Sequence, residues 1–453
     1  MDNDDATPPS PQLESEMSRH QRNLVDLCLE EGQYEQAIDV LNQLRAPNLK
    51  PSAAHIRQLL FIALYSSRDS GADKTLSEVT ASPSKRPKKS HLLPSPGATL
   101  ASQQLLVSFA ITNSPAAVIR ALRPAGTDAA VEGDNESLVA TESMCISRCK
   151  NCWEILADGF LARNRPNPKG KGKQNDSSFD LDVESQIPVG ESAWPVLDWL
   201  LLIFERDEQA NPTLPRHSVL LLEQLGTPTR RNTDASLSVV MYCLQQSDER
   251  RRMMGSRLMN LLINLSSTTQ LDFPMLILSV FNHLSPLSQN DISSFMSSLT
   301  PSPAVSKFKI ALYQKYFSDS NDAARVAARP RPQARAQPKG SPVKARAAPV
   351  EAPPLVNRYR PPGSSEILRL MEATTTAPSV SVDSLYKLKF ELLVSYNAYQ
   401  TEASATDKDP EWPNILRNGI MAKTLDSAFG CKTGGTEDPG SYRDLLKMVL
   451  NVH

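Results

Sequence analysis

Three cysteines stand close together in the sequence CISRCKNC: Cys145, Cys149 and Cys152, called the 145–152 cysteines here. Thiolates bind iron and zinc, and three of them can hold a [4Fe–4S] cluster while one iron stays open to a cofactor. A closed zinc site needs four protein ligands, and no further Cys or His lies nearby in the sequence. These three residues are therefore the candidate metal site of the chain.

The C-x3-C-x2-C spacing resembles the cluster loop of radical S-adenosylmethionine enzymes, which implies a strand–helix barrel around an iron–sulfur cluster. The chain departs from that family at Asn151, where an aromatic residue is usual, and shows no alternation of strands and helices. A packing interpretation uses more residues. The 145–152 cysteines, Leu156 and Phe160 recur every three or four positions, so one helical face would bury them together. We expect packing residues, with no cofactor and no metal.

Other patterns of catalytic residues are not found in the sequence. The six histidines are dispersed, and there is no phosphate-binding loop, dinucleotide fingerprint or nucleophile elbow. We therefore expect a protein that is not an enzyme.

The composition favours helical modules joined by linkers. The 453 residues include 35 Pro and 18 Gly, and 49 Lys+Arg oppose 50 Asp+Glu for a net charge of −1. This excludes collagen, disulfide-rich miniproteins and highly cationic polyanion binders. Apolar residues recur with helical periodicity, and the expected N-caps are Asp234 and either Ser288 or Asn290. The predicted fold class is all-α: an irregular helical bundle or stacked helical hairpins, with long disordered linkers.

The same patterns divide the chain into eight segments. Four are predicted to be helical, and four, rich in Pro, Ser or charge, are predicted to be unstructured. The helical segments are 15–66, 104–163, 193–318 and 364–453. The others are an acidic N-terminus at 1–14, a Ser/Pro linker at 67–103, a polar linker at 164–192 and a basic Pro/Ala-rich linker at 319–363.

Residues 24–64 have the pattern of a helical hairpin. Leu24, Leu27 and Cys28 form the expected inner face of its first helix, and Gly32 permits a tight turn. The segment resembles one tetratricopeptide or pentatricopeptide repeat through Gly32, Tyr34, Ala37, Ile38, Leu41 and Lys50-Pro51. No second copy occurs at a fixed period, and such repeats normally stack in arrays. The resemblance implies a surface for partners, and the pentatricopeptide form implies RNA binding. An ordinary amphipathic hairpin explains the same residues.

The basic run Lys85-Arg86-Pro87-Lys88-Lys89 lies in the Ser/Pro linker and favours recognition by a nuclear import receptor. No secretory signal, mitochondrial presequence or membrane span is predicted. We therefore expect a nuclear location and no membrane partner. A solvated charge run is the alternative interpretation of the four cations.

Three Ser/Thr-Pro-x-Lys/Arg sites, at Ser82, Thr227 and Ser341, resemble substrates of cyclin-dependent kinases. Shorter Ser/Thr-Pro sites include Ser95, Ser285, Thr300 and Ser302. In the basic linker, seven cations occur without an acid between residues 323 and 350, which favours sequence-independent nucleic-acid binding or a solubilising role. They are Arg325, Arg329, Arg331, Arg335, Lys339, Lys344 and Arg346.

These observations together predict a nuclear helical scaffold or adaptor, associated with chromatin or the cell cycle and regulated by proline-directed phosphorylation. It would bind other proteins through its helical surfaces. An RNA-binding helical-repeat protein is the first alternative, and a radical enzyme is the second.

Overall fold

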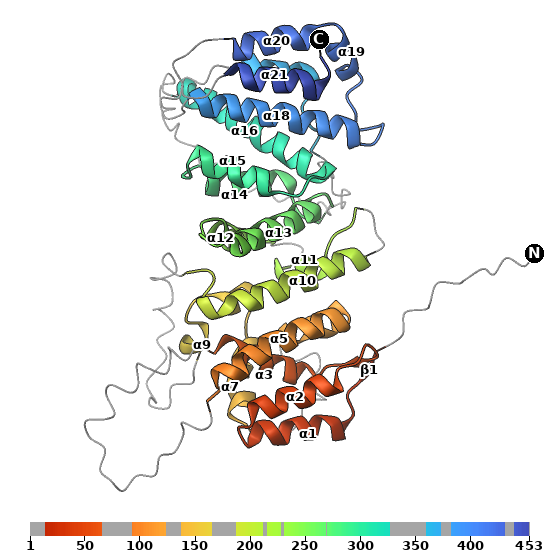
Figure 1. Ribbon diagram of the computed structural model, residues 1–453, viewed down its shortest axis with the longest axis vertical. Helices are drawn as coiled ribbons and strands as arrows, with labels where there is room; N and C mark the ends of the chain where they lie inside the picture. Colours follow the sequence, from red (N-terminus) through yellow and green to blue (C-terminus); the bar gives the residue numbers. More distant parts are fainter. Residues whose placement is uncertain are drawn as a thin grey trace, which may run out of the picture. The chain divides into compact units, whose positions relative to one another are not determined.

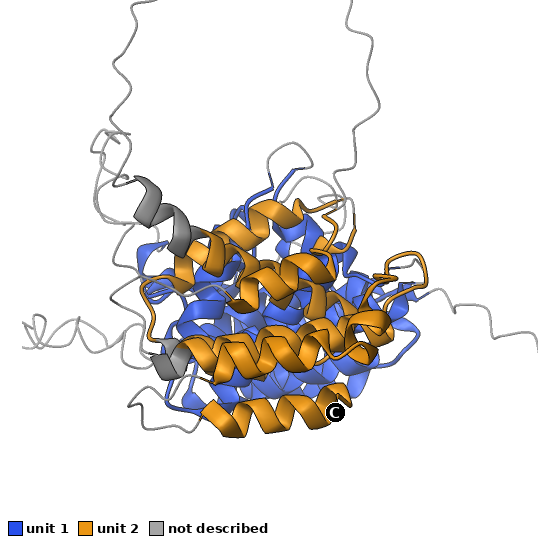
Figure 2. Cartoon of the chain, turned by 90° about the horizontal axis from the view of Figure 1, so that it is seen from above, with its two compact units in different colours: residues 1–265 blue, residues 266–453 orange. Residues whose placement is uncertain are grey.

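The computed structural model describes residues 14–65, 93–123, 137–164, 187–211, 215–227, 231–268, 270–326, 359–372, 382–430 and 439–452. The chain forms two compact units, Met1–Leu265 and Ser266–His453 (Figure 2). Their elements are almost entirely helical (Figure 1), which confirms the predicted all-α class. Within the described ranges, no helix has both the length and the apolarity needed to span a bilayer.

Unit 1 begins with a helical hairpin and continues through helices of very different lengths. The helices are α1 Arg19–Glu30, α2 Tyr34–Leu44, α3 Ala53–Leu64, α5 Pro96–Thr112, α6 Pro115–Ile119, η3 Arg120–Leu122, α7 Leu138–Ser147, α8 Trp153–Leu156, α9 Phe160–Arg163, η6 Glu191–Ala193, α10 Trp194–Ala210, α11 Val219–Gln224, α12 Asp234–Leu244 and α13 Glu249–Ser266. A capping box between Ser18 and Gln21 starts α1, and Gly32 at φ 74° makes the turn to α2.

The central helix of unit 1 is α3, which is buried on all sides from His55 to Leu64. It packs against α5, α7, η3 and α10. A helix surrounded in this way needs apolar residues around its whole circumference rather than one stripe. The continuous run LLFIAL at its C-terminal half meets that requirement.

A short strand pair, which the sequence did not predict, holds the N-terminal segment in unit 1. β1 (Ser15–Glu16) runs parallel to β2 (Leu49–Lys50). Glu16 accepts two hydrogen bonds from Arg120, at 2.6 and 2.9 Å. Glu14, assigned to the disordered N-terminus in the sequence prediction, accepts bonds from the backbone and hydroxyl of Ser114. Two-residue strands leave no recognisable pattern, because their pairing depends on segments far apart in the sequence.

Ion pairs join α10 to α13. Arg257 donates to both oxygens of Glu205 at 2.7 Å and to Asp198 at 2.6 Å. Arg250 also binds Asp198, at 2.9 Å. Burial raises the pKa of Asp198, but hydrogen bonds from Arg257 and Arg250 outweigh it, so this pKa lies below its usual value. These charged groups fix the register of two helices whose inner faces are apolar.

Unit 2 is built around α16 and α18, which pack against each other. Its helices are α14 Phe273–Leu284, α15 Gln289–Ser298, α16 Pro303–Val326, α17 Ser364–Glu372, α18 Val382–Glu402, α19 Trp412–Arg417, α20 Ile420–Phe429 and α21 Pro439–Leu450. Ring contacts attach the last helices to α18: Tyr386 with Phe429, Phe390 with Tyr442, and Tyr396 with Trp412. Aromatic pairs of this kind stabilise cores beyond the area that they bury.

The boundaries of the elements differ from the predicted segments in several places. α5 begins at Pro96, inside the predicted Ser/Pro linker, and α16 continues to Val326, inside the predicted basic linker. The boundary between the units, at 265/266, lies inside the predicted 193–318 domain. Local composition cannot locate a unit boundary that depends on which helices pack together.

Candidate functional site

The 145–152 cysteines lie at the end of α7 and in the turn that leads to α8, so the prediction of one continuous helical stripe is wrong. Cys145 belongs to α7, Cys149 follows its end, and Cys152 is the residue before α8. α7 ends at Ser147, and α8 starts after a turn in which the side-chain oxygen of Asn151 accepts the backbone N–H groups of Trp153 and Glu154, at 3.1 and 3.3 Å. All three cysteines are nevertheless buried, as the packing interpretation requires.

Burial also sets the chemistry of these thiols. It raises the pKa of Cys145 to about 11 and that of Cys149 to about 12, and it raises the pKa of Cys152 well above its usual value. The thiolate is the form that binds metals and attacks electrophiles, so these side chains are unreactive at neutral pH. In the part of the chain that the structure describes, no three His, Cys, Asp or Glu side chains are grouped to hold a metal ion.

Most of the residues predicted to act in nuclear import, phosphorylation or nucleic-acid binding lie outside the described residues. These are the import residues Lys85, Arg86, Lys88 and Lys89, the phosphorylation sites Ser82 and Ser341, and the cations Arg329, Arg331, Arg335, Lys339, Lys344 and Arg346. Two residues predicted to have these roles belong to the described part of the chain. Arg325 belongs to the end of α16, and Thr227 is exposed in the loop after α11.

Several Ser-Pro pairs start helices. Ser95 and Ser114 are the N-caps of α5 and α6, and each is followed by a Pro in the first turn. The hydroxyl of Ser95 accepts the Ala98 N–H at 2.9 Å and donates to Glu35 at 2.7 Å. Ser302 accepts the Val305 N–H at 3.2 Å at the start of α16. A Ser N-cap followed by Pro is a preferred helix start, so these pairs have a structural explanation independent of any kinase.

The helical hairpin at 24–64 forms, but α1 turns a different face inward from the predicted one. Val25 and Leu29 are buried, whereas Leu24 and Leu27 are 44% and 55% exposed. The sequence has apolar residues at 24, 25, 27, 28 and 29. Its periodicity therefore allowed either the face with Leu24 or the face with Val25 to be buried. Packing against α2 selects the Val25–Leu29 face.

The last helix, α21, has two apolar faces. Leu446 and Leu450 are buried, and α21 packs against α18 and α20. The other face carries Leu445, Met448 and Val449, which are 45%, 72% and 49% exposed and are called the α21 patch here. Residues at i, i+3 and i+4 of a helix lie side by side, so the three form one apolar surface.

Ion pairs hold α21 in this orientation. Asp426 of α20 accepts from Lys447 at 2.9 Å and lies 3.9 Å from Arg443. Both cations lie beside the buried face, so rotating α21 to bury its patch would break these pairs. The α21 patch is therefore a stable feature of the surface in this structure.

Comparison with protein-family models, with curated proteins and with solved structures found no match to this chain.

The α21 patch was not identified from the sequence, although the signal was present. The run YRDLLKMVL contains too many apolar residues for a single buried stripe. A search for helices with apolar residues on two faces would have selected this segment.

Proposed function

We propose that this chain is a non-enzymatic nuclear adaptor that binds partner proteins through its helices. The α21 patch is the observation that carries the proposal. Single exposed apolar residues are common on soluble proteins, but adjacent ones on an element that is already packed are typical of interaction sites. Met448 is the most exposed residue of the patch, and its flexible side chain adapts to different partner surfaces.

The properties of the titratable groups support a binding role rather than catalysis. The 145–152 cysteines are buried and protonated at neutral pH, so they are poor candidates for covalent or metal chemistry. The helical hairpin of α1 and α2 adds a second surface with exposed leucines. Helical hairpins of this kind present side chains to partners along their outer faces.

The experiment that tests the α21 patch is affinity purification of the full chain from nuclei. Replacement of Leu445, Met448 and Val449 by Gln should remove specific co-purifying proteins while leaving the thermal denaturation curve unchanged. Ile111→Gln is the matched control, because Ile111 is an isolated apolar residue that is 61% exposed on α5. The same partners recovered with the patch variant would refute this role of α21.

The nuclear location is supported by the run Lys85–Lys89 and has its own test. A reporter fusion in which Lys85, Arg86, Lys88 and Lys89 are replaced by Ala should spread into the cytoplasm. A reporter that stays nuclear would contradict the import role of this run.

Binding of nucleic acid by residues 323–350 is the further part of the proposal, supported by seven cations without an acid. Release of counterions from duplex DNA limits the slope of log K against log salt to about −6 for seven contacts. Deletion of 323–350 should abolish the binding, and a phosphomimetic change at Ser341 should weaken it, because the added negative charge lies between cations. Equal affinity of the intact and deleted chains would show that the segment is only a spacer.

A further inference from the structure

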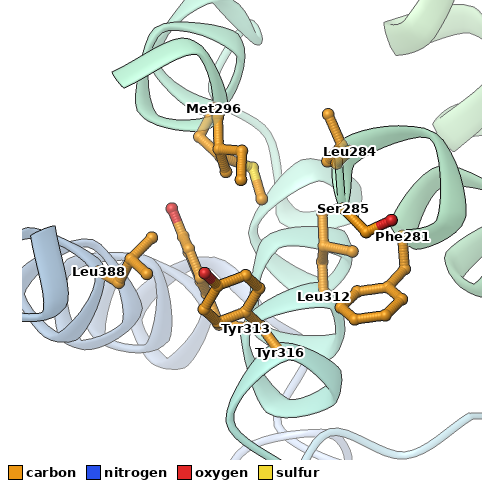
Figure 3. Close-up of a pocket in the computed structure, with 9 residues that line it drawn as sticks. Phe281, Leu284, Ser285, Met296, Leu312, Tyr313, Tyr316 and Leu388 are labelled. Atoms are coloured by element: carbon orange, nitrogen blue, oxygen red, sulfur yellow. The ribbon is translucent and has the colours of Figure 1, made fainter. Parts of the chain in front are cut away.

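The narrow cavity between α14, α15, α16 and α18 of unit 2 is lined by apolar and aromatic side chains (Figure 3). Tyr313 lies between Met296 and Leu388 there, and both its ring and its hydroxyl are buried. The space that remains has room for about one water molecule, so it is a gap in the packing rather than a ligand site. A surface that could bind a partner lies elsewhere, on the outer face of α1 in unit 1.

Four exposed residues form a line along α1, on the side away from the buried Val25 and Leu29. They are His20, Leu24, Leu27 and Glu31, called the α1 seam here. Their spacing of four, three and four residues is that of the a and d positions of a coiled coil, which keep one line of a helix against a second helix. Since α1 packs against α2 through its other face, the seam is positioned to meet such a helix.

The charges of α1 are arranged in the opposite sense to the one that stabilises an isolated helix. Its first turn contains basic residues and no acid, and its C-terminal end contains acidic residues and no base. These residues are Arg19, His20 and Arg22 at the first end and Glu30 and Glu31 at the other. A helix N-terminus favours negative charge and a C-terminus favours positive charge, so both ends of α1 are unfavourable in this respect. Apart from Arg22, these side chains are exposed, and none of those four forms an ion pair with another described residue.

We propose that α1 pairs with α1 of a second copy of this chain, antiparallel across a two-fold axis. The spacing of the α1 seam is the same from either end, so an antiparallel pair places Leu24 of one copy against Leu27 of the other. The same register places His20 against Glu31 at both ends of the contact. The basic end of each helix then meets the acidic end of its partner, which accounts for charges that are unfavourable in a single α1. A parallel pair would instead bring like residues together.

The size of α1 sets the strength of this contact. A helix of 12 residues is about 18 Å long, so the α1 seam forms a small interface. Interfaces of this size are typical of weak, transient complexes, and the dimer should therefore dissociate on dilution. This inference deepens the binding role proposed for the helical hairpin of α1 and α2 and does not depend on the α21 patch.

The test is a charge exchange, followed by sedimentation equilibrium of the full chain over a series of concentrations. His20→Glu places two carboxylates together at each end of the antiparallel contact, and Glu31→Lys places a cation beside His20. The two-fold axis repeats each change, so either variant should weaken the dimer about tenfold. The double variant restores opposite charges and should regain the wild-type dissociation constant. In a parallel pair the double variant would keep like charges together and regain nothing.

Neither single change is expected to unfold α1, which keeps the test specific. An acid in the first turn and a base at the C-terminal end both stabilise a helix through its dipole, so the melting temperature should not fall. Replacement of Leu24 and Leu27 by Gln should make the chain monomeric. Leu100→Gln is the matched control, because Leu100 is 57% exposed on α5, outside the α1 seam, and this variant should dimerise like the wild type.

The α21 patch variant separates this proposal from the adaptor function. With Leu445, Met448 and Val449 replaced by Gln, the chain should still dimerise, whereas loss of the dimer in this variant would assign the contact to α21. A wild-type chain that is monomeric at its highest soluble concentration would overturn the proposal and leave the affinity purification through α21 unaffected. A dimer that survives the change at Leu24 and Leu27, or a double charge variant as weak as the single ones, would overturn it as well.

Discussion

Replacement of Lys389 by Met tests the energetics of unit 2 most directly. Lys389 lies on α18, is 3% exposed, and forms no ion pair among the described residues. Burial lowers the pKa of Lys389 from 10.5 to about 8. Since one pKa unit corresponds to ~1.4 kcal/mol, the buried charge destabilises the folded state by about 3 kcal/mol at most. Met keeps the aliphatic stem and removes the charge, so Lys389→Met should be more stable at pH 7.

The stability gained by Lys389→Met depends on pH, because Lys389 binds its proton less tightly in the folded state than in the unfolded state. Below pH 8 both the folded and unfolded states hold the proton, and the full penalty is present. Between pH 8 and 10.5 the folded state loses this proton while the unfolded state keeps it, so the stability of the wild type rises with pH. Above 10.5 both states are neutral. The advantage of Lys389→Met should therefore be largest at pH 7 and should disappear by about pH 10.5.

The assay is urea denaturation of protein labelled with 5-fluorotryptophan, followed by fluorine NMR between pH 7 and 10. Trp412 is the only one of the four tryptophans in unit 2, so its resonance reports the unfolding of that unit. Lys423→Met on α20 is the matched control, because Lys423 is exposed. A Lys389→Met variant that is no more stable than the wild type at pH 7, or whose advantage does not change with pH, would refute the reasoning.

Three further predictions concern unit 1. Gly255→Ala should destabilise the protein by about 1–3 kcal/mol in thermal denaturation. The new Cβ would lie 2.8 Å from Cβ of Cys243 and 3.0 Å from the backbone oxygen of Val240, both in α12. Arg257→Ala should cost about 1–3 kcal/mol by leaving the half-buried carboxylate of Glu205 without its partner, while Asp198 keeps Arg250. Arg252→Ala, which breaks an exposed pair, should cost less than about 0.5 kcal/mol. In alkylation mapped by mass spectrometry at pH 8, Cys28 should react before the buried 145–152 cysteines, and a denaturant should remove the difference.

Some elements of unit 2 could be located from local residues alone. Ser288 was one of the predicted N-caps, and its hydroxyl accepts the Asp291 N–H at 3.3 Å at the start of α15. The prediction at Asp234 is wrong by one residue, because Thr233 is the N-cap of α12 and Asp234 lies in its first turn. The helical segment predicted at 364–453 contains the long helix α18 at Val382–Glu402. Capping and helical periodicity act within a few residues, so the sequence contains the whole signal for these elements.

Other features needed contacts between distant residues. The sequence suggested one helix through the 145–152 cysteines. A turn interrupts it, in which the Asn151 side chain accepts the Trp153 N–H and the Cys152 N–H donates to Gln224 at 2.9 Å. The choice between the Leu24 and Val25 faces of α1 was also open locally. In each case, two local structures satisfied the same periodicity, and tertiary packing selected one of them.

The sequence by itself determined the all-α class and local features such as the N-cap of α15. These properties follow from local propensity, capping and periodicity. Only the tertiary structure decided that Lys389 and the Tyr313 hydroxyl are buried and that the α21 patch is exposed. Burial depends on which surfaces of distant helices meet, and the residues that form those surfaces are separated by long stretches of chain.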